Sequence, residues 1–232
     1  MKPEIIAALD VPTADDIPPI VDSIGDSVSY YKVGLEIFTA EGPACLDYLK
    51  SKNKQIFLDL KLHDIPRTVA NAVTSAAQHN VSLLTVHACG GRAMLEAAAE
   101  AARESGTDMK LIAVTTLTSL DENDFTDLGI TRTLSQQANA LGELAISSGI
   151  DGLVTSVHEV ETLRATFGPD ALLVTPGIRP AGGDVADQKR VATPAIAVER
   201  GSSYLVIGRP ILQADDPAAA AKAIQEEIDS AC

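Results

Sequence analysis

The chain has 232 residues, of which 46% are hydrophobic and only 3% aromatic, so one large domain or two small ones would be built around an aliphatic core. Its formal net charge of −14 disfavours nucleic acids and anionic membranes as partners, although a local cluster of basic groups would still bind a small anionic substrate. No apolar run reaches the roughly 20 residues of a membrane span, the run at 5–9 is too short for a signal peptide, and the three cysteines lack CxxC spacing, so we expect a reduced, cytoplasmic protein.

Short aliphatic runs of strand length alternate along the chain with alanine-rich stretches that have helical character. The last helical stretch carries its own start signal, because two aspartates at 215–216 precede Pro217. We predict strands at 5–10, 30–34, 55–61, 83–87, 111–117, 152–156, 172–177 and 204–208. We predict helices near 14–24, 37–51, 67–79, 91–104, 133–148, 157–166, 193–200 and 216–230.

This alternation predicts an α/β fold with a parallel sheet. The strand cores are almost entirely apolar, which is typical of strands covered on both faces. Eight such units in 232 residues fit a closed (β/α)8 TIM barrel, with residues 1–232 as a single domain because no linker divides them. An open doubly wound sheet is the alternative, but the first strand-to-helix turn lacks the GxGxxG of a dinucleotide fold, which favours the barrel.

Charged residues stand where the first three predicted strands end, and in a barrel the chemistry gathers at those ends. Asp10 follows the first strand and Lys32 lies in the second. Asp59 and Lys61 close the third, and residues two apart on a strand point to the same side. Asp64 follows in the turn. Because charges at the end of an apolar strand are costly unless they are paired, this pattern predicts an active site built from alternating charges.

The loops after the seventh and eighth strands read Pro-Gly-Ile-Arg at 176–179 and Gly-Arg-Pro at 208–210. Glycine allows the backbone to approach an anion, and arginine binds phosphate oxygens with a bidentate fork. Gln188 lies in the loop after the seventh strand and would bridge phosphate and another part of a ligand. Either Gly-Arg pair alone would be an ordinary turn, but two pairs at the two places that bind phosphate in this fold predict a phosphate site.

The four histidines give no sign of a metal centre. His79 would end a helix and His158 would begin one. His63 and His87 lie nearer the predicted site, yet none of the four forms HxH, HExxH or a Cys/His set with ligand spacing. We therefore interpret them as structural residues and predict no metal ligand.

The ten residues from Asp59 to Thr68, Asp-Leu-Lys-Leu-His-Asp-Ile-Pro-Arg-Thr, are the most specific motif in the chain. With it the chain resembles the orotidine 5′-phosphate decarboxylase family, in its compact bacterial form, over essentially its whole length. Further matching motifs are Leu-Asp-Val at 9–11, Tyr-Lys-Val-Gly at 31–34, Val-Thr-Thr-Leu-Thr-Ser at 114–119, Thr-Pro-Gly-Ile-Arg at 175–179 and Val-Ile-Gly-Arg-Pro at 206–210.

The resemblance implies an activity and a set of catalytic roles. The reaction would convert orotidine 5′-monophosphate to uridine 5′-monophosphate in de novo pyrimidine biosynthesis, in a homodimer with no metal or organic cofactor. Lys61 would stabilise and protonate the carbanion at C6 of the pyrimidine, and Asp59 would face the substrate carboxylate. Lys32 and Asp64 would complete the charge network, Asp64 by reaching into the partner subunit's site.

The resemblance also implies the contacts to the nucleotide. Asp10 and Lys32 would contact the ribose hydroxyls, and Thr118 and Ser119 would meet the pyrimidine. The glycine-containing segment at 180–184 would be a mobile lid. The remaining implied contacts are Ile65 and Thr68, which lie across the dimer interface, Pro176 after the seventh strand, and Arg179, Gln188, Gly208 and Arg209 around the phosphate.

Two other interpretations remain. A magnesium-dependent keto-gulonate phosphate decarboxylase, or its aldolase-like relative, shares the Asp-x-Lys-x-x-Asp signature but carries an acidic metal ligand where this chain has Lys32. A non-catalytic phosphosugar-binding barrel is the other, and it predicts the loss of one of the four network charges, all of which are present.

Overall fold

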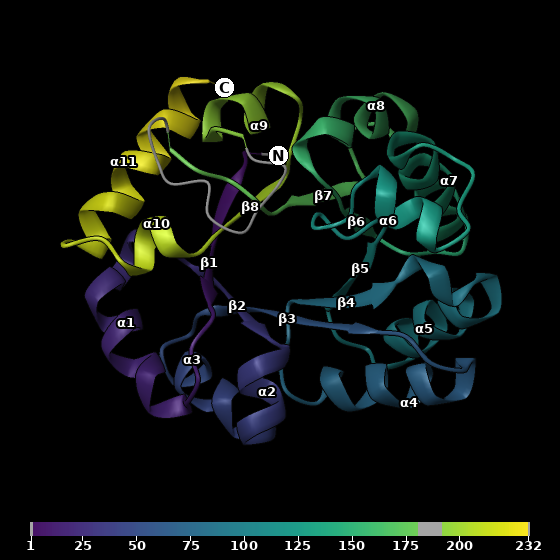
Figure 1. The fold of residues 1–232 in the computed structure, drawn as a ribbon. Helices are drawn as coiled ribbons and strands as arrows, with labels where there is room; N and C mark the ends of the chain where they lie inside the picture. Colours follow the sequence, from purple (N-terminus) through teal and green to yellow (C-terminus); the bar gives the residue numbers. More distant parts are fainter. Residues whose placement is uncertain (1, 181–191, 232) are drawn as a thin grey trace.

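A computed structural model describes residues 2–180 and 192–231, and in them all eight predicted strands are present. Each strand pairs in parallel with the next, and β8 returns to β1, so the sheet is a closed barrel (Figure 1). The predicted (β/α)8 barrel is confirmed, and the open doubly wound sheet is excluded. The strands are β1 (Glu4–Leu9), β2 (Tyr30–Gly34), β3 (Gln55–Leu62), β4 (Leu83–His87), β5 (Lys110–Val114), β6 (Gly152–Val154), β7 (Leu172–Thr175) and β8 (Tyr204–Ile207).

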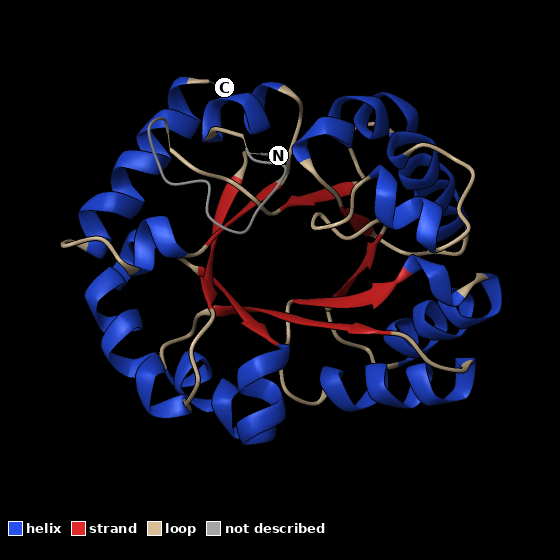
Figure 2. Cartoon of the chain, viewed as in Figure 1, coloured by secondary structure: helices blue, strands red, loops and turns tan. Residues whose placement is uncertain are grey.

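The helices form a ring around the barrel (Figure 2). None of the helices in residues 2–180 and 192–231 is both long and apolar enough to cross a membrane. They are α1 (Ile17–Ile24), α2 (Leu35–Glu41), α3 (Asp47–Ser51), α4 (Pro66–Ala77), α5 (Arg92–Glu104), α6 (Glu122–Asp127), α7 (Leu134–Ser147), α8 (Val157–Phe167), α9 (Pro194–Glu199), α10 (Arg209–Leu212) and α11 (Pro217–Ser230), with short 3₁₀ turns η1 (Ala14–Asp16), η2 (Gly25–Ser27), η3 (Gly42–Leu46) and η4 (Ala88–Gly90).

Two parts of the helical prediction were wrong. The single helix expected at 37–51 is three elements, because Gly42 takes a φ of 60° and Pro43 follows it, which ends α2 and starts a 3₁₀ turn. Two short helices, α6 and α10, were not predicted. Asp121 caps α6 by accepting hydrogen bonds from the N–H groups of Asn123 and Asp124.

The core has two layers, as the strict alternation of β1 illustrates. Ile5, Ala7 and Leu9 pack outward against the helices, whereas Ile6 and Ala8 belong to the barrel interior. The interior is small and is filled by Ile6, Ala8, Phe57, Leu83, Ile112, Val174, Tyr204 and Val206. These buried side chains pack inside the barrel as a core, and the described part of the chain leaves no channel through it.

Several predicted strands extend too far at their C-terminal ends. Strand β5 ends at Val114 rather than 117, and β6 ends at Val154 rather than 156. The chain stays buried there, with Thr115 and Thr155 both 0% exposed, and their N–H groups still donate to the carbonyls of Val154 and Val174 on the next strands. The apolar pattern therefore predicted strand where burial and one last inter-strand hydrogen bond continue beyond the assigned ends.

Candidate active site

A cavity of about 500 Å³ lies at the mouth formed by the C-terminal ends of the strands. Its floor is apolar, its walls carry charges, and it brings together residues from almost every part of the chain. The apolar lining residues are Ala8, Phe57, Val114, Val154 and Val206, those at or after the ends of β1, β2, β3 and β5 are Asp10, Lys32, Asp59, Lys61, Thr116, Leu117 and Thr118, and those after β7 and β8 are Pro176, Gly177, Arg179, Gly208, Arg209, Leu212 and Gln213.

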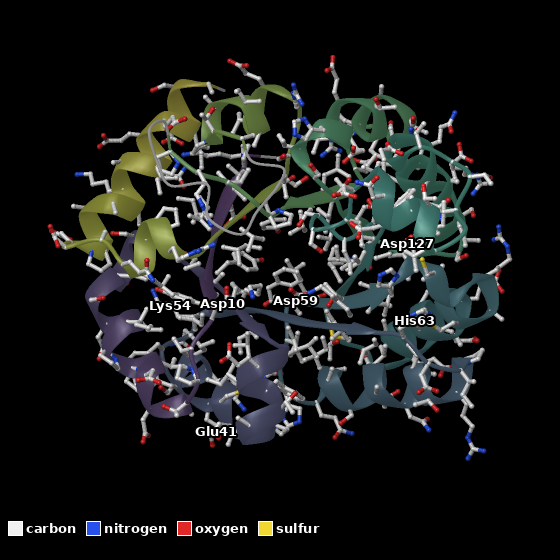
Figure 3. The ribbon with its side chains drawn as sticks, in the orientation of Figure 1. Asp10, Glu41, Lys54, Asp59, His63 and Asp127 are labelled. Carbon is white, nitrogen blue, oxygen red and sulfur yellow. The ribbon has the colours of Figure 1, made fainter. Side chains whose placement is uncertain are left out.

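Asp59 and Lys61 form an ion pair within this cavity. The Lys61 Nζ lies 2.8 Å from Asp59 Oδ2, and the two side chains are 31% and 14% exposed. Figure 3 shows Asp59 and Asp10 at the mouth of the barrel. The prediction that the third strand presents an acid and an amine together is confirmed.

The backbone route to this pair differs from the regular strand that was predicted. The residues Leu58 and Leu62 of β3 pair with Leu84 and Val86 of β4, so the register shifts between them. Lys61 takes a φ of 49°, in the left-handed region that costs a non-glycine residue roughly 1 kcal/mol or more. The pair meets because the chain bulges, and not because two residues alternate along a flat strand.

A second ion pair lies beside the first. Lys32 Nζ is 2.6 Å from Asp10 Oδ1, and the lysine side chain is only 12% exposed. Gly34 lies against this pair, because a Cβ built on it would come within 3.1 Å of Lys32 Nζ. The site therefore carries two adjacent acid–amine pairs from three neighbouring strands.

Four of the predicted residues that the structure describes do not line the cavity of their own chain. Asp64, Ile65 and Thr68 lie at the exposed start of α4, where Asp64 Oδ1 accepts a hydrogen bond from the Ile65 N–H at 2.7 Å and Ile65 is 66% exposed. Their role in a partner subunit's site stays a prediction. Ser119 is exposed and lies outside the cavity lining, whereas its neighbour Thr118 lines it.

The predicted phosphate residues lie together on one side of the cavity. Pro176, Arg179, Gly208 and Arg209 all line it, although they come from the loops after two different strands. Gln188, and residues 181–184 of the predicted lid, lie outside the described residues. Two further lining residues, Leu212 at the end of the short helix α10 and Gln213 directly after it, were not predicted, because α10 was missed.

The two histidines near the site stack on each other. The rings of His63 and His87 are 5.3 Å apart at an interplanar angle of 23°, and His87 Nδ1 accepts a hydrogen bond from the Cys89 N–H at 3.3 Å. Burial lowers the pKa of His87, and the neighbouring His63 and Lys61 lower it further. In residues 2–180 and 192–231, no group of three or more His, Cys, Asp or Glu side chains is placed to hold a metal ion.

Comparison with known proteins gives one consistent family. The family model described as "Orotidine 5′-phosphate decarboxylase / HUMPS family" matches residues 3–224. The orotidine 5′-phosphate decarboxylase of Moorella thermoacetica is 47% identical over 98% of this chain and 93% of its own length, and that of a Marinomonas species is 50% identical over 93% of this chain and 92% of its own. The crystal structure of the Lactobacillus acidophilus enzyme of the same name superposes with a TM-score of 0.87 at 38% identity, covering 99% of this chain and 100% of that one.

Proposed function

The chain belongs to the orotidine 5′-phosphate decarboxylase / HUMPS family, and from this premise we propose that it is the carboxy-lyase that converts orotidine 5′-monophosphate to uridine 5′-monophosphate in pyrimidine biosynthesis. The observation that carries the proposal is the ion pair between Lys61 and Asp59 in the cavity. An amine and a carboxylate lie side by side there, in a cavity that apolar side chains and two arginines also line.

The mechanism follows from where the electrons go. Loss of CO₂ from C6 of the pyrimidine leaves an electron pair in the plane of the ring, where the π system cannot delocalise it. A fixed positive charge must stabilise it, and the ammonium of Lys61 is such a charge. Because the amine is already held by Asp59 at 2.8 Å, little reorganisation is needed before it stabilises the carbanion and then donates a proton to it.

Asp59 acts on the ground state. Two carboxylates about 3 Å apart at an effective dielectric constant of 20 repel each other by roughly 5 kcal/mol. A substrate carboxylate placed against Asp59 would lose this repulsion when CO₂ departs. The ammonium of Lys61 reduces the repulsion, so we assign it a smaller share of the rate than carbanion stabilisation.

The other predicted residues would contact three parts of the nucleotide: the ribose, the pyrimidine and the phosphate. Lys32 and Asp10 would bind the ribose hydroxyls, and Thr118 the pyrimidine. Arg179 and Arg209 would hold the phosphate, with Pro176 and Gly208 beside them. Phosphate binding is remote from C6, so its energy is available to close loops over the ring and to offset strain there.

We propose that the reaction needs no metal ion. The magnesium-dependent relatives carry an acidic ligand at the position of Lys32, and here that position holds an ammonium 2.6 Å from Asp10. A positive charge in the cavity repels Mg²⁺. The Asp10 carboxylate, which would otherwise attract the ion, is already paired with the Lys32 ammonium.

We also propose a cytoplasmic homodimer in which Asp64, Ile65 and Thr68 complete the partner's site. The support is that these residues stand exposed together at the start of α4, outside the cavity of their own chain. Mixing inactive Lys61→Ala and Asp64→Ala chains under conditions that exchange subunits should restore up to about a quarter of wild-type activity, because half of the randomly assorted dimers would have one intact site. No recovery would contradict a shared site.

The primary test is an absorbance assay of the pure protein on orotidine 5′-monophosphate, with and without EDTA. We expect the ultraviolet absorbance of the carboxylated pyrimidine to fall as the substrate is consumed, and to fall at the same rate with EDTA as without it. Activity that EDTA removes and Mg²⁺ restores would contradict the metal-free mechanism. Turnover of a keto-gulonate phosphate in place of the nucleotide would contradict the proposed function itself.

A further inference from the structure

A buried hydroxyl in β4 contacts both members of the Asp59–Lys61 pair. Thr85 is 0% exposed, and its Oγ1 donates a hydrogen bond to Asp59 Oδ1 at 3.0 Å. The same oxygen accepts a hydrogen bond from the Lys61 N–H at 2.8 Å. A hydroxyl has one proton to donate, and a backbone N–H can only donate, so the direction of both bonds is fixed.

The bond to Lys61 replaces one that the bulge removes. The β3–β4 pairing is interrupted between Leu58 and Leu62, and Lys61 lies in that interval with a φ of 49°. A strained backbone of this kind persists only where its surroundings hold it. The Thr85 hydroxyl supplies the acceptor that the Lys61 N–H needs in this conformation.

The bond to Asp59 fixes the carboxylate. Asp59 Oδ1 accepts from Thr85 while Oδ2 lies against the Lys61 ammonium at 2.8 Å, so one oxygen is held on each side. With both oxygens engaged, rotation of the carboxylate would break a hydrogen bond. The amine and the carboxylate are therefore set against each other by one side chain from the neighbouring strand.

We propose that Thr85 is a positioning residue: its hydroxyl holds the Lys61 backbone and the Asp59 carboxylate in the geometry that decarboxylation requires. The claim that Thr85 holds these two residues in place rests on the two hydrogen bonds. The claim that this affects turnover rests on the proposed function. Thr85 itself does not line the cavity. Its effect should therefore fall on turnover rather than on substrate binding.

The test is the steady-state kinetics of Thr85→Val and Thr85→Ser. Valine keeps the shape and removes the hydroxyl, whereas serine keeps the hydroxyl and removes the methyl group. We expect Thr85→Val to lower kcat about 100-fold with KM within about threefold of wild type, since a misplacement of about 1 Å costs on that order. Thr85→Ser should keep kcat within about threefold of wild type.

Thr175→Val is the matched control. Thr175 in β7 is also 0% exposed, and its hydroxyl shares a 2.7 Å hydrogen bond with Ser202 rather than with the catalytic pair. It should lose stability like any buried threonine that loses a bond, with kcat within about threefold. If Thr85→Val does not fold, Thr85→Cys, of similar size and with only a weak S–H donor, takes its place.

The inference is overturned if Thr85→Val keeps near-normal kcat, if Thr85→Ser falls as far as Thr85→Val, or if Thr175→Val loses as much. A wild-type protein with no decarboxylase activity would instead overturn the proposed function. In that case a crystal structure of Thr85→Val decides the positional claim. A Lys61 that leaves the left-handed region or loses its contact with Asp59 supports the claim, and an unchanged pair refutes it.

Discussion

The two ends of the barrel use polar groups in opposite ways. At the N-terminal ends of the strands, the Arg164 guanidinium donates to the carbonyls of Gly168, Ala171 and Gly201 and to the Ser203 hydroxyl, at 2.7 to 3.1 Å. At the C-terminal ends, each amine of the site pairs with one carboxylate among residues 2–180 and 192–231 and faces a cavity. All the N–H donors of Arg164 are engaged within the protein, whereas the amines of the site have donors available for a ligand.

The difference shows where this chain places stability and where it places chemistry. Saturated groups such as Arg164 join α8 to the loops before β7 and β8 and have nothing left to offer a substrate. At the same end Tyr30 and Tyr204 pack edge to face with ring centroids 5.3 Å apart. Charged side chains that face the cavity contribute less to the free energy of unfolding, because their remaining hydrogen-bonding groups are kept for the substrate.

The largest expected effect belongs to the C-terminal end. Lys61→Ala removes the ammonium that stabilises the carbanion and donates the proton, so we expect kcat to fall on the order of 10⁴-fold or more. The free energy of unfolding should change by less than about 1 kcal/mol, because the ion pair is partly exposed. Steady-state kinetics and urea unfolding measure the two effects. Lys110→Ala, which removes an amine 3.4 Å from Asp151 at the start of β5, is the control and should keep full turnover. Near-normal turnover of the Lys61 variant would refute its assigned role.

At the N-terminal end of the barrel we expect the opposite result, a loss of stability with little change in turnover. Arg164→Met leaves the carbonyls of Gly168, Ala171 and Gly201 without their donor, so we expect the free energy of unfolding to fall by about 3 kcal/mol. The kcat of the folded variant should stay within twofold of wild type. Urea unfolding followed by circular dichroism gives the first quantity. Arg103→Met removes an exposed guanidinium that pairs with Glu100 at 3.3 Å, and it should cost less than about 0.5 kcal/mol. Equal losses in the two variants would contradict the assigned role of Arg164.

Most of the fold and the charged part of the site could be predicted from the sequence. The eight strands are visible because each is a short apolar run, and Asp59 and Lys61 are visible because they interrupt one. The bulge that joins them is not visible, because a lysine has no local preference for a positive φ and a side chain of another strand holds it there.

The residues that were missed share a physical reason. A threonine in a strand is an ordinary β-former, so nothing marks Thr85 until β4 is seen beside the bulge. Gln213 caps the C-terminus of α10, and this helix of four residues is too short for a periodic pattern to reveal it. Gln188 lies outside the described residues, and its predicted contact with phosphate stays a prediction.

Two glycines, one at each end, give a smaller and sharper comparison. A Cβ on Gly152 would lie 2.2 Å from the Leu172 carbonyl oxygen, so Gly152→Ala must move backbone and should cost about 2 kcal/mol or more of unfolding free energy. A Cβ on Gly34 would lie 3.1 Å from the flexible Lys32 amine and in ordinary contact, at 3.8 Å, with Asp10 Oδ1, and the φ of Gly34 is −101°, which alanine adopts freely. Gly34→Ala should therefore leave stability within about 0.5 kcal/mol and lower kcat/KM by about tenfold by displacing Lys32. If Gly34→Ala instead unfolds the protein and stays fully active when folded, the proposed division between the two ends is wrong.

The smallest effect is a pH dependence at the C-terminal end. Burial, His63 and Lys61 lower the pKa of His87 in the folded protein, whereas the unfolded chain has a histidine pKa near 6.5. Below about pH 6.5 the unfolded state therefore binds a proton that folded His87 does not, and the stability that neutral His87 contributes is lost as the pH falls towards the lowered folded pKa. Protonation would also remove the Nδ1 lone pair that accepts from the Cys89 N–H.

We expect wild type to lose more stability than His87→Asn between pH 7.5 and pH 5.5 in urea unfolding, while His79→Asn, beyond the end of α4, should follow wild type. Parallel pH profiles of wild type and His87→Asn would show that the stacked pair, at the C-terminal end of β4, does not make the stability of the fold sensitive to protons.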